Sequence, residues 1–216
     1  MKKIILSAAL VLFTILGASA EDWGKTYFNG ATNVRLGYSM PVNASGSHLT
    51  GGFDLGLNLL EFGVRPYDNG AVSLGVDFML DTFNAEEGYY FLSSAHKTAI
   101  FPSVLDIKAS RTEHLAFAIP LDFTHNFGND LRISLGAAAK INLNSDTYMR
   151  YINATKDHCT SSVSGIYTNR LTWDVHMAVT YQEFGIYASY SPMKVYPESN
   201  GPSFNYLSVG VILKNL

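Results

Sequence analysis

The feature that most constrains the fold of this chain is a two-residue alternation of apolar with small or polar side chains. Between Gly51 and Leu80, for example, Phe53 and Leu55 alternate with Asp54 and Gly56. Side chains on a β-strand point alternately to its two faces. The pattern therefore predicts strands that have one apolar face and one small or polar face.

Eight runs of this kind follow one another along the chain, and few segments have helical periodicity. Several runs approach the length of about 9–11 residues with which a tilted strand crosses a bilayer. A further hairpin within YYFLSS and FPSVLDIKAS would raise the number of strands from eight to ten. The runs cover residues 33–40, 53–59, 72–80, 115–123, 131–143, 171–181, 184–190 and 205–214.

The first residues, MKKIILSAALVLFTILGASA, have the three parts of a Sec signal peptide. A basic start is followed by an uncharged apolar run from Ile4 to Leu16 and by an A-x-A site that ends at Ala20. We predict cleavage between Ala20 and Glu21 and export from the cytoplasm. Residues 1–20 are then the signal peptide, and residues 21–216 form one domain.

The composition of the chain narrows the class of protein further. Cys159 is the single cysteine, so no internal disulfide can stabilise an exported domain of this size. A closed β-ladder could do so instead. The formal net charge is −3, which gives no indication of a nucleic-acid partner.

The connections between the eight runs alternate in length. The second, fourth and sixth connections are short and contain turn residues such as Asp68, Asn69 and Gly70. The first, third, fifth and seventh are longer, and the longest cover residues 81–114 and 144–170. Bacterial outer-membrane barrels have short periplasmic turns and long outer loops, whereas a soluble sandwich has no reason to sort its loops in this way.

The small and polar face decides between a soluble sandwich and a membrane barrel. A sandwich would expose this face to water and would carry many Lys and Glu there, but the face is made of Gly, Ala, Ser, Thr and Asn with a few charges. Such residues suit the narrow lumen of an eight-stranded barrel. We therefore expect an all-β, antiparallel, up-and-down transmembrane β-barrel whose apolar faces meet outer-membrane lipid.

The charges on the lumen face should be paired, because an unpaired buried charge is costly. If Phe123 faces Leu131 across the HNFGND turn, Asp122 lies beside Arg132. A similar register of the opening hairpin places Asp54 beside Asp77, with Arg35 as their cation. The expected lumen network contains Arg35, Asp54, Asp77, Asp122, Arg132, Lys140, Asp174, His176 and Lys214.

Aromatic residues near the strand ends could form the interfacial girdles of a membrane barrel, although they also suit ordinary β-strands. The candidates are Tyr38, Phe53, Phe62, Phe78, Phe123, Trp173, Tyr181, Phe184, Tyr190 and Phe204.

Three segments resemble the outer membrane protein beta-barrel domain family, often called PorT-like. They are LAFAIPLDFTHNFGNDLRISLGAAAKINL, WDVHMAVTYQEFGIYASYSPM and the closing NYLSVGVILKNL. The chain departs from the family at Gly136-Ala137-Ala138, where a Gly-Pro-Tyr-like end is usual, and at Leu216, where many such barrels end in an aromatic residue. The resemblance implies an eight-stranded outer-membrane barrel, with no catalytic residues to carry over.

No motif for catalysis, metal binding or cofactor binding stands out. The adjacent Asp157, His158 and Cys159 in KDHC could suggest a nucleophile or metal site, and Asp174 with His176 could be an acid–base pair. A solvated loop and a lumen hydrogen bond are the simpler interpretations. We expect no enzyme, no cofactor and no metal.

The leading functional hypothesis is a monomeric, non-enzymatic outer-membrane barrel. Its lumen would be plugged, its long outer loops would contact a surface ligand or protein, and the barrel assembly machinery would be a partner. One alternative is a narrow channel or carrier for small apolar molecules, with Pro120 marking a break in the wall. Two others are a lipid-modifying outer-membrane enzyme and a soluble periplasmic β-domain.

Overall fold

A computed structural model of the protein describes residues 26–30, 33–44, 46–94, 97–128, 130–153 and 155–214. The expected signal peptide, its cleavage site at Ala20 and Glu21, and Leu216 lie outside these residues. Within the described ranges, no helix has the length and apolar character needed to cross a membrane.

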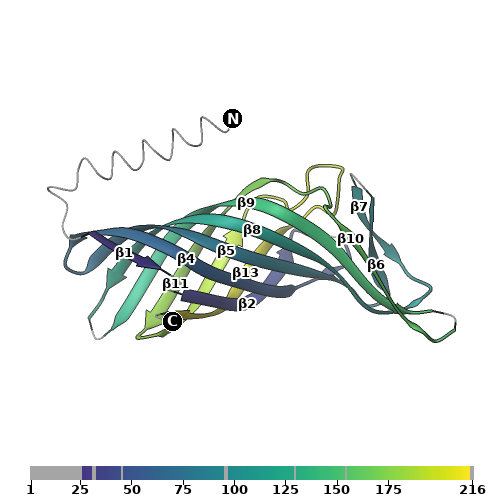
Figure 1. Cartoon of the computed structure of the whole chain (residues 1–216), viewed down its shortest axis with the longest axis horizontal. Helices are drawn as coiled ribbons and strands as arrows, with labels where there is room; N and C mark the ends of the chain where they lie inside the picture. Colours follow the sequence, from purple (N-terminus) through teal and green to yellow (C-terminus); the bar gives the residue numbers. More distant parts are fainter. Residues whose placement is uncertain are drawn as a thin grey trace.

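Eight strands of the described chain close into a ring in which each strand is antiparallel to both of its neighbours (Figure 1). Neighbours in the ring follow one another in the sequence, and pairing of the last strand with the first completes it. The predicted all-β, up-and-down barrel of eight strands is thus confirmed. In ring order the strands are β2 (Asn33–Val42), β4 (Gly52–Tyr67), β5 (Gly70–Ala85), β8 (Asp106–Asn126), β9 (Leu131–Ile152), β11 (Leu171–Tyr181), β12 (Phe184–Ser191) and β13 (Asn205–Lys214).

One side of the wall is much longer than the other. Strands β8 and β9 have 21 and 22 residues, whereas β12 and β13 have 8 and 10. The β8–β9 ladder therefore continues past the ring as a ribbon, and β10 (His158–Ser164) pairs with the part of β9 in this ribbon. Much of residues 81–114 and 144–170, which we expected to be loops, is strand instead.

An additional hairpin forms in the third connection, but it does not enter the barrel wall. Strands β6 (Tyr89–Ser94) and β7 (Lys97–Pro102) make a separate two-stranded sheet. Phe91 is buried, and its N–H donates to Ser110 Oγ on β8 at 2.9 Å. The alternative of ten barrel strands is therefore wrong, because the hairpin packs against the ribbon.

Two short strands extend the ring at its margins. Strand β1 (Thr26–Gly30) pairs with residues 60–64 of β4, next to the part of β4 that pairs with β2. Strand β3 (Leu49–Thr50) pairs with the last residues of β5. They lie at opposite ends of the barrel.

The connections sort into two ends, as their lengths predicted. Tight turns that include residues 68–69, 127–128 and 182–183 lie at one end, which we name the turn end. The ribbon, the β6–β7 hairpin and residues 192–204 lie at the other end, which we name the ribbon end (Figure 1).

The distribution of side chains is the reverse of that in a soluble domain. Large apolar side chains on the outer face of the ring are exposed, with Leu135 at 55%, Ile186 at 65% and Phe184 at 68%. Charged side chains on the inner face are buried, and Lys140 is only 1% exposed. The ring therefore encloses a polar lumen within an apolar outer surface.

Candidate functional site

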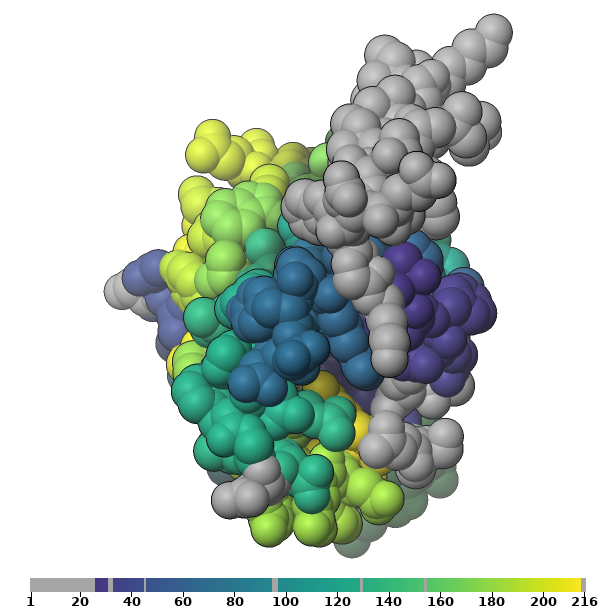
Figure 2. Space-filling model, turned by 90° about the vertical axis from the view of Figure 1, so that its left-hand side faces the viewer, coloured from purple at the N-terminus to yellow at the C-terminus, as the bar shows by residue number. Residues whose placement is uncertain are grey.

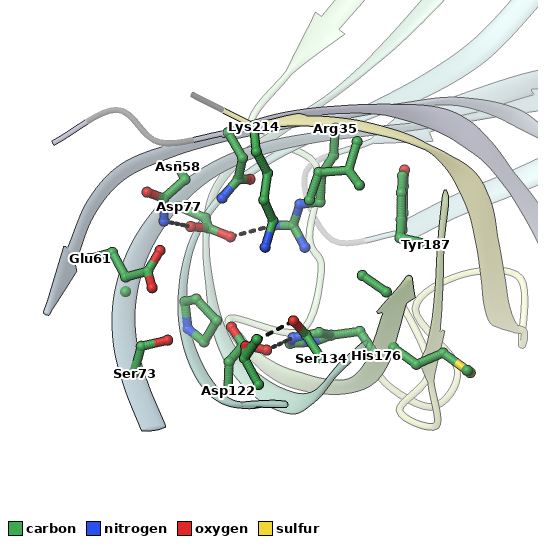
Figure 3. Close-up of a pocket in the computed structure, with 17 residues that line it drawn as sticks. Arg35, Asn58, Glu61, Ser73, Asp77, Asp122, Ser134, His176, Tyr187 and Lys214 are labelled. Carbon is green, nitrogen blue, oxygen red and sulfur yellow. Dashed lines mark hydrogen bonds and ion pairs between the residues drawn. The ribbon is translucent and has the colours of Figure 1, made fainter. Parts of the chain in front are cut away.

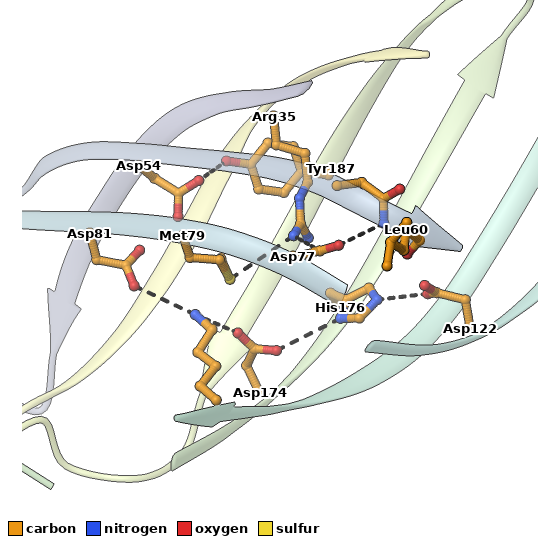
Figure 4. A network of polar contacts seen from close by, with 12 residues as sticks. Arg35, Asp54, Leu60, Asp77, Met79, Asp81, Asp122, Asp174, His176 and Tyr187 are labelled. Atoms are coloured by element: carbon orange, nitrogen blue, oxygen red, sulfur yellow. Dashed lines mark hydrogen bonds and ion pairs between the residues drawn. The ribbon is translucent and has the colours of Figure 1, made fainter. Parts of the chain in front are cut away.

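The lumen holds a network of charged side chains contributed by strands from around the ring (Figure 4). Its part nearest the ribbon end centres on Lys140 of β9. The Lys140 ammonium lies 2.7 Å from Asp174 Oδ2 of β11 and 3.5 Å from Asp81 Oδ2 of β5. It also donates to Tyr206 Oη of β13 at 3.0 Å. One lysine thus joins four strands across the lumen.

The middle of the network centres on Arg35 of β2. Its guanidinium forms an ion pair with Asp77 of β5 and lies over the Tyr187 ring of β12, 5.9 Å from the ring centre. The Asn58 amide donates to the other oxygen of Asp77 at 2.7 Å. Tyr187 in turn donates its hydroxyl hydrogen to Asp54 Oδ1. These contacts cross the barrel and leave little open space.

The part nearest the turn end centres on His176 of β11. Its Nε2 lies 2.7 Å from Asp122 Oδ1 (Figure 3), and its Nδ1 lies 3.7 Å from Asp174 Oδ1 (Figure 4). Gly136 of β9 pairs in register with both Asp122 and His176. A Cβ at Gly136 would lie 2.7 Å from His176 Nε2, so glycine leaves the space in which this contact forms.

Two of the expected lumen residues, Arg132 and Lys214, lie at the turn end. They line a cavity of about 240 Å³ together with Glu61 and Arg65. A smaller cavity of about 60 Å³ continues inward to Asp122 and its neighbours. In Figure 2, which views this end, the turns surround a hollow with part of the yellow closing strand inside it.

An apolar cluster lies at the ribbon end of the barrel. Residues 192–204 bring Val195, Tyr196 and Phe204 onto Phe83 and Tyr206, and all five side chains are buried. The Tyr196 hydroxyl is buried without a hydrogen-bond partner among the described residues, and burial raises the pKa of this side chain. Phe204 was expected in an interfacial girdle and instead belongs to this buried cluster.

The expected pair of Asp122 with Arg132 is wrong. Strand β8 continues past Phe123 to Asn126, which is the residue that faces Arg132. The turn is therefore tighter than assumed, and Asp122 faces Gly136 and contacts His176.

The expected pairing of Asp54 with Asp77 is also wrong. Strand β4 runs through Pro66 to Tyr67, so Asp54 faces Asp81 and Asn58 faces Asp77. Pro66 lies at a register shift between Val64 and Tyr67, where a missing N–H breaks no ladder hydrogen bond. The run expected from the sequence ended at Leu59, whereas β4 stays paired with β5 as far as Tyr67, so the expected register was wrong.

Sequence reasoning missed several residues of the network, among them Asp81, Tyr187 and Tyr206. Asp81 continues the alternation of Asp77 and Met79 and could have been found from that signal. Tyr187 was missed because the facing of residues 184–190 was ambiguous. Tyr206 was placed on the small, polar face but was not recognised as a partner of Lys140.

The KDHC segment does not assemble a reactive site in the described residues. His158 and Cys159 are consecutive on β10 and thus point to opposite faces. Asp157 lies in the preceding turn, where hydrogen bonds from Thr155 and Asn153 hold the pKa of its carboxyl below the usual value. The described residues contain no group of three or more His, Cys, Asp or Glu side chains suited to a metal ion.

Comparison with protein-family models finds no match, and comparison with curated proteins finds none either. Among solved structures, the chain is similar to Ail, the attachment invasion locus protein of Yersinia pestis, with 12% identity and a TM-score of 0.37. The alignment covers 86% of this chain and 98% of that one. Ail in complex with the heparin analogue sucrose octasulfate gives 11% identity and a TM-score of 0.35, with the same coverage.

Structural similarity at these TM-scores does not establish a family or a function for this chain. The resemblance to the PorT-like family stays a prediction.

Proposed function

We propose that the protein is an integral outer-membrane β-barrel without enzymatic activity, which has a closed lumen and presents its ribbon end for contacts at the cell surface. The turn end faces the periplasm in this proposal, and the ribbon end faces outward. This orientation agrees with short periplasmic turns and long outer segments in bacterial barrels.

The reversed burial of apolar and charged residues is the observation that carries the proposal. Contiguous apolar patches larger than a few hundred Å² are rare on soluble monomers. Here apolar side chains such as Leu135, Val175 and Val209 are exposed on strands around the ring. Contact with lipid removes the cost of exposing them to water, about 25 cal/mol per Å². A soluble periplasmic domain would leave this cost in place.

The lumen supports a closed barrel rather than a carrier for small apolar molecules. Ion pairs cross its middle, an apolar cluster lies at the ribbon end, and the inner cavity of about 60 Å³ is lined mainly by polar residues. The β5–β8 ladder is interrupted beside Pro120, which lacks an N–H. We expect purified protein in planar bilayers to show no conductance above background, whereas stable unitary currents would favour the channel.

The ribbon end supports a role in surface contacts. Val104 and Leu105, in the connection from β7 to β8, and Phe101 of β7 are exposed apolar residues outside the ring. Exposed loop residues carried on a rigid scaffold are common contact sites. The proposed partner is a surface ligand or protein.

The position of His176 supports a non-enzymatic role. Its ring is enclosed between Asp122 and Asp174 inside the barrel, with a side chain only 8% exposed. A lipid-modifying enzyme would need such a group at the outer rim, where lipid can reach it. If His176→Ala abolished a measured lipid-modifying activity while the barrel still folded, this part of the proposal would be wrong.

Cell fractionation combined with heat-modifiability tests the proposed location. We expect the protein in the outer-membrane fraction, with a gel mobility in SDS that changes on boiling because a closed barrel resists SDS until heated. Recovery in the soluble periplasm without a mobility change would contradict the proposal. An established outer-membrane barrel and an established soluble periplasmic protein serve as controls for the two fractions.

A further inference from the structure

Two buried aspartates lie opposite each other on neighbouring strands, in the half of the lumen nearer the ribbon end. Asp54 of β4 and Asp81 of β5 pair in register, and they are only 1% and 4% exposed. One oxygen of each is anchored, since Tyr187 donates to Asp54 Oδ1 and Tyr206 donates to Asp81 Oδ2 at 3.1 Å. The other two oxygens, Asp54 Oδ2 and Asp81 Oδ1, are buried without a partner among the described residues.

Two ionised carboxylates cannot satisfy each other in this position. Both groups would be acceptors only, and a buried acceptor left without a donor costs about 1–3 kcal/mol. Like charges side by side in a buried site add repulsion. Carboxyl pairs in such surroundings relieve both effects by holding one proton between them.

The surrounding charges do not supply the missing donor. Lys140 is 2.7 Å from Asp174 and 3.5 Å from Asp81, on the oxygen that is already anchored. Arg35 is engaged by Asp77. A metal ion between the aspartates would lie beside the Lys140 ammonium and would be repelled by its positive charge. A proton instead becomes part of one neutral carboxylic acid. The charged and titratable groups near the pair are Arg35, Asp77, His114, Lys140, Asp174, Tyr187 and Tyr206.

We propose that Asp54 and Asp81 bind a single proton between Asp54 Oδ2 and Asp81 Oδ1 in the folded barrel at neutral pH. The proton comes from water, forms one O–H bond, and lowers the charge of the pair from −2 to −1. It also joins Asp81 to Asp54 in a series of contacts that runs between the turn end and Tyr187. The series passes through Asp122, His176, Asp174, Lys140, Asp81 and Asp54 (Figure 4).

The end of this series at Asp122 and His176 lies beside the cavities of the turn end. Asp122 and His176 line the inner cavity, which shares Lys214 and Glu61 with the larger cavity at the turn end. The apolar cluster of Phe83, Tyr196 and Phe204 lies at the opposite, ribbon end.

Infrared spectroscopy of the full mature chain, refolded in detergent at pH 7, tests the proposal. We expect a carbonyl band of a protonated carboxylic acid that shifts in D2O and is lost in both Asp54→Asn and Asp81→Asn. An asparagine keeps a hydrogen donor in the pair, so both variants should still fold, which the heat-dependent mobility change verifies. Asp122→Asn is the matched control, because Asp122 already has His176 as its partner, and it should retain the band.

Absence of the band from the wild type, or its persistence in both single variants, would overturn the proposal. A metal ion in place of the proton would give a different result. The melting temperature would then rise with NaCl or CaCl2 relative to N-methylglucamine chloride of equal ionic strength, an outcome that also overturns it. Because the measurements use any folded barrel in detergent, they do not depend on the proposed cellular location.

Discussion

Lys140 shows how a single side chain can hold the lumen together. Its ammonium is 1% exposed and lies within 3.5 Å of two carboxylates. Removing one member of a buried ion pair leaves the other charged and unpaired, which costs more than the pair itself contributes. The network should therefore respond more strongly to a single substitution than to a matched pair of substitutions.

We predict that Lys140→Met lowers the free energy of unfolding by about 3–5 kcal/mol, because Asp174 and Asp81 lose their cation. Urea unfolding of the protein refolded in lipid vesicles measures this loss. Adding Asp174→Asn to Lys140→Met should recover part of it. A loss below about 1 kcal/mol in the single variant would mean that the ammonium is not buried in this network.

Two double-mutant cycles distinguish the observed register from the one expected from the sequence. We predict coupling of about 0.5–3 kcal/mol between Asp122→Asn and His176→Gln, since the two side chains are in contact. Asp122→Asn and Arg132→Gln should be additive within about 0.5 kcal/mol. Coupling in the second cycle without coupling in the first would restore the sequence-based register.

At the scale of elements, residues 192–204 are the segment that most clearly combines packing with function. They form no strand, yet they place Val195, Tyr196 and Phe204 in the apolar cluster at the ribbon end. Their contribution is to packing, because the Tyr196 hydroxyl has no hydrogen-bond partner among the described residues.

We predict that Tyr196→Ala destabilises the barrel by about 3–5 kcal/mol, as expected when a large buried aromatic side chain is removed. Tyr196→Phe should be neutral or slightly stabilising, because it removes a buried hydroxyl that bonds to nothing in the cluster. Thermal unfolding in detergent, followed by the gel mobility shift, compares the two variants. A loss in Tyr196→Phe as large as that in Tyr196→Ala would show that the hydroxyl has an essential partner.

The strands could be predicted from the sequence because alternation reports directly on the two faces of a barrel wall. The register could not, because it depends on where each turn begins, and Pro66 looks like a turn residue although it lies within β4 at a register shift. The ribbon was missed for a similar reason. In β8, the residues before Leu115 do not separate into an apolar and a polar face, so the strand begins earlier than the alternation does.

The lumen network could be predicted only in part from the sequence. The alternation of side chains identifies residues that point into the lumen, such as Asp122 and Lys140. It does not identify their partners, because these come from strands that are distant in sequence. The contact between Lys140 and Tyr206 joins residues 66 positions apart. Such contacts depend on the closed ring and its register, which no local pattern specifies.

At the scale of the whole molecule, an outer-membrane barrel requires that the outer face of the wall meets lipid. Trp173 lies on the outer face of β11 and is 46% exposed, while its neighbour Asp174 points into the lumen and is buried. The chain has two tryptophans, at positions 23 and 173, so Trp23→Phe leaves Trp173 as the single reporter. Its fluorescence therefore reports the surroundings of the outer face without an attached label.

Quenching of Trp173 fluorescence by phospholipids with brominated acyl chains tests whether the apolar outer face of the barrel meets lipid. The Trp23→Phe protein is refolded into vesicles of brominated or unmodified lipid, and the mobility change on boiling verifies that it has folded. We predict strong quenching in the brominated vesicles only, because the Trp173 ring contacts acyl chains. Equal fluorescence in both vesicles would contradict the account and would mean that the apolar faces pack against protein instead of lipid.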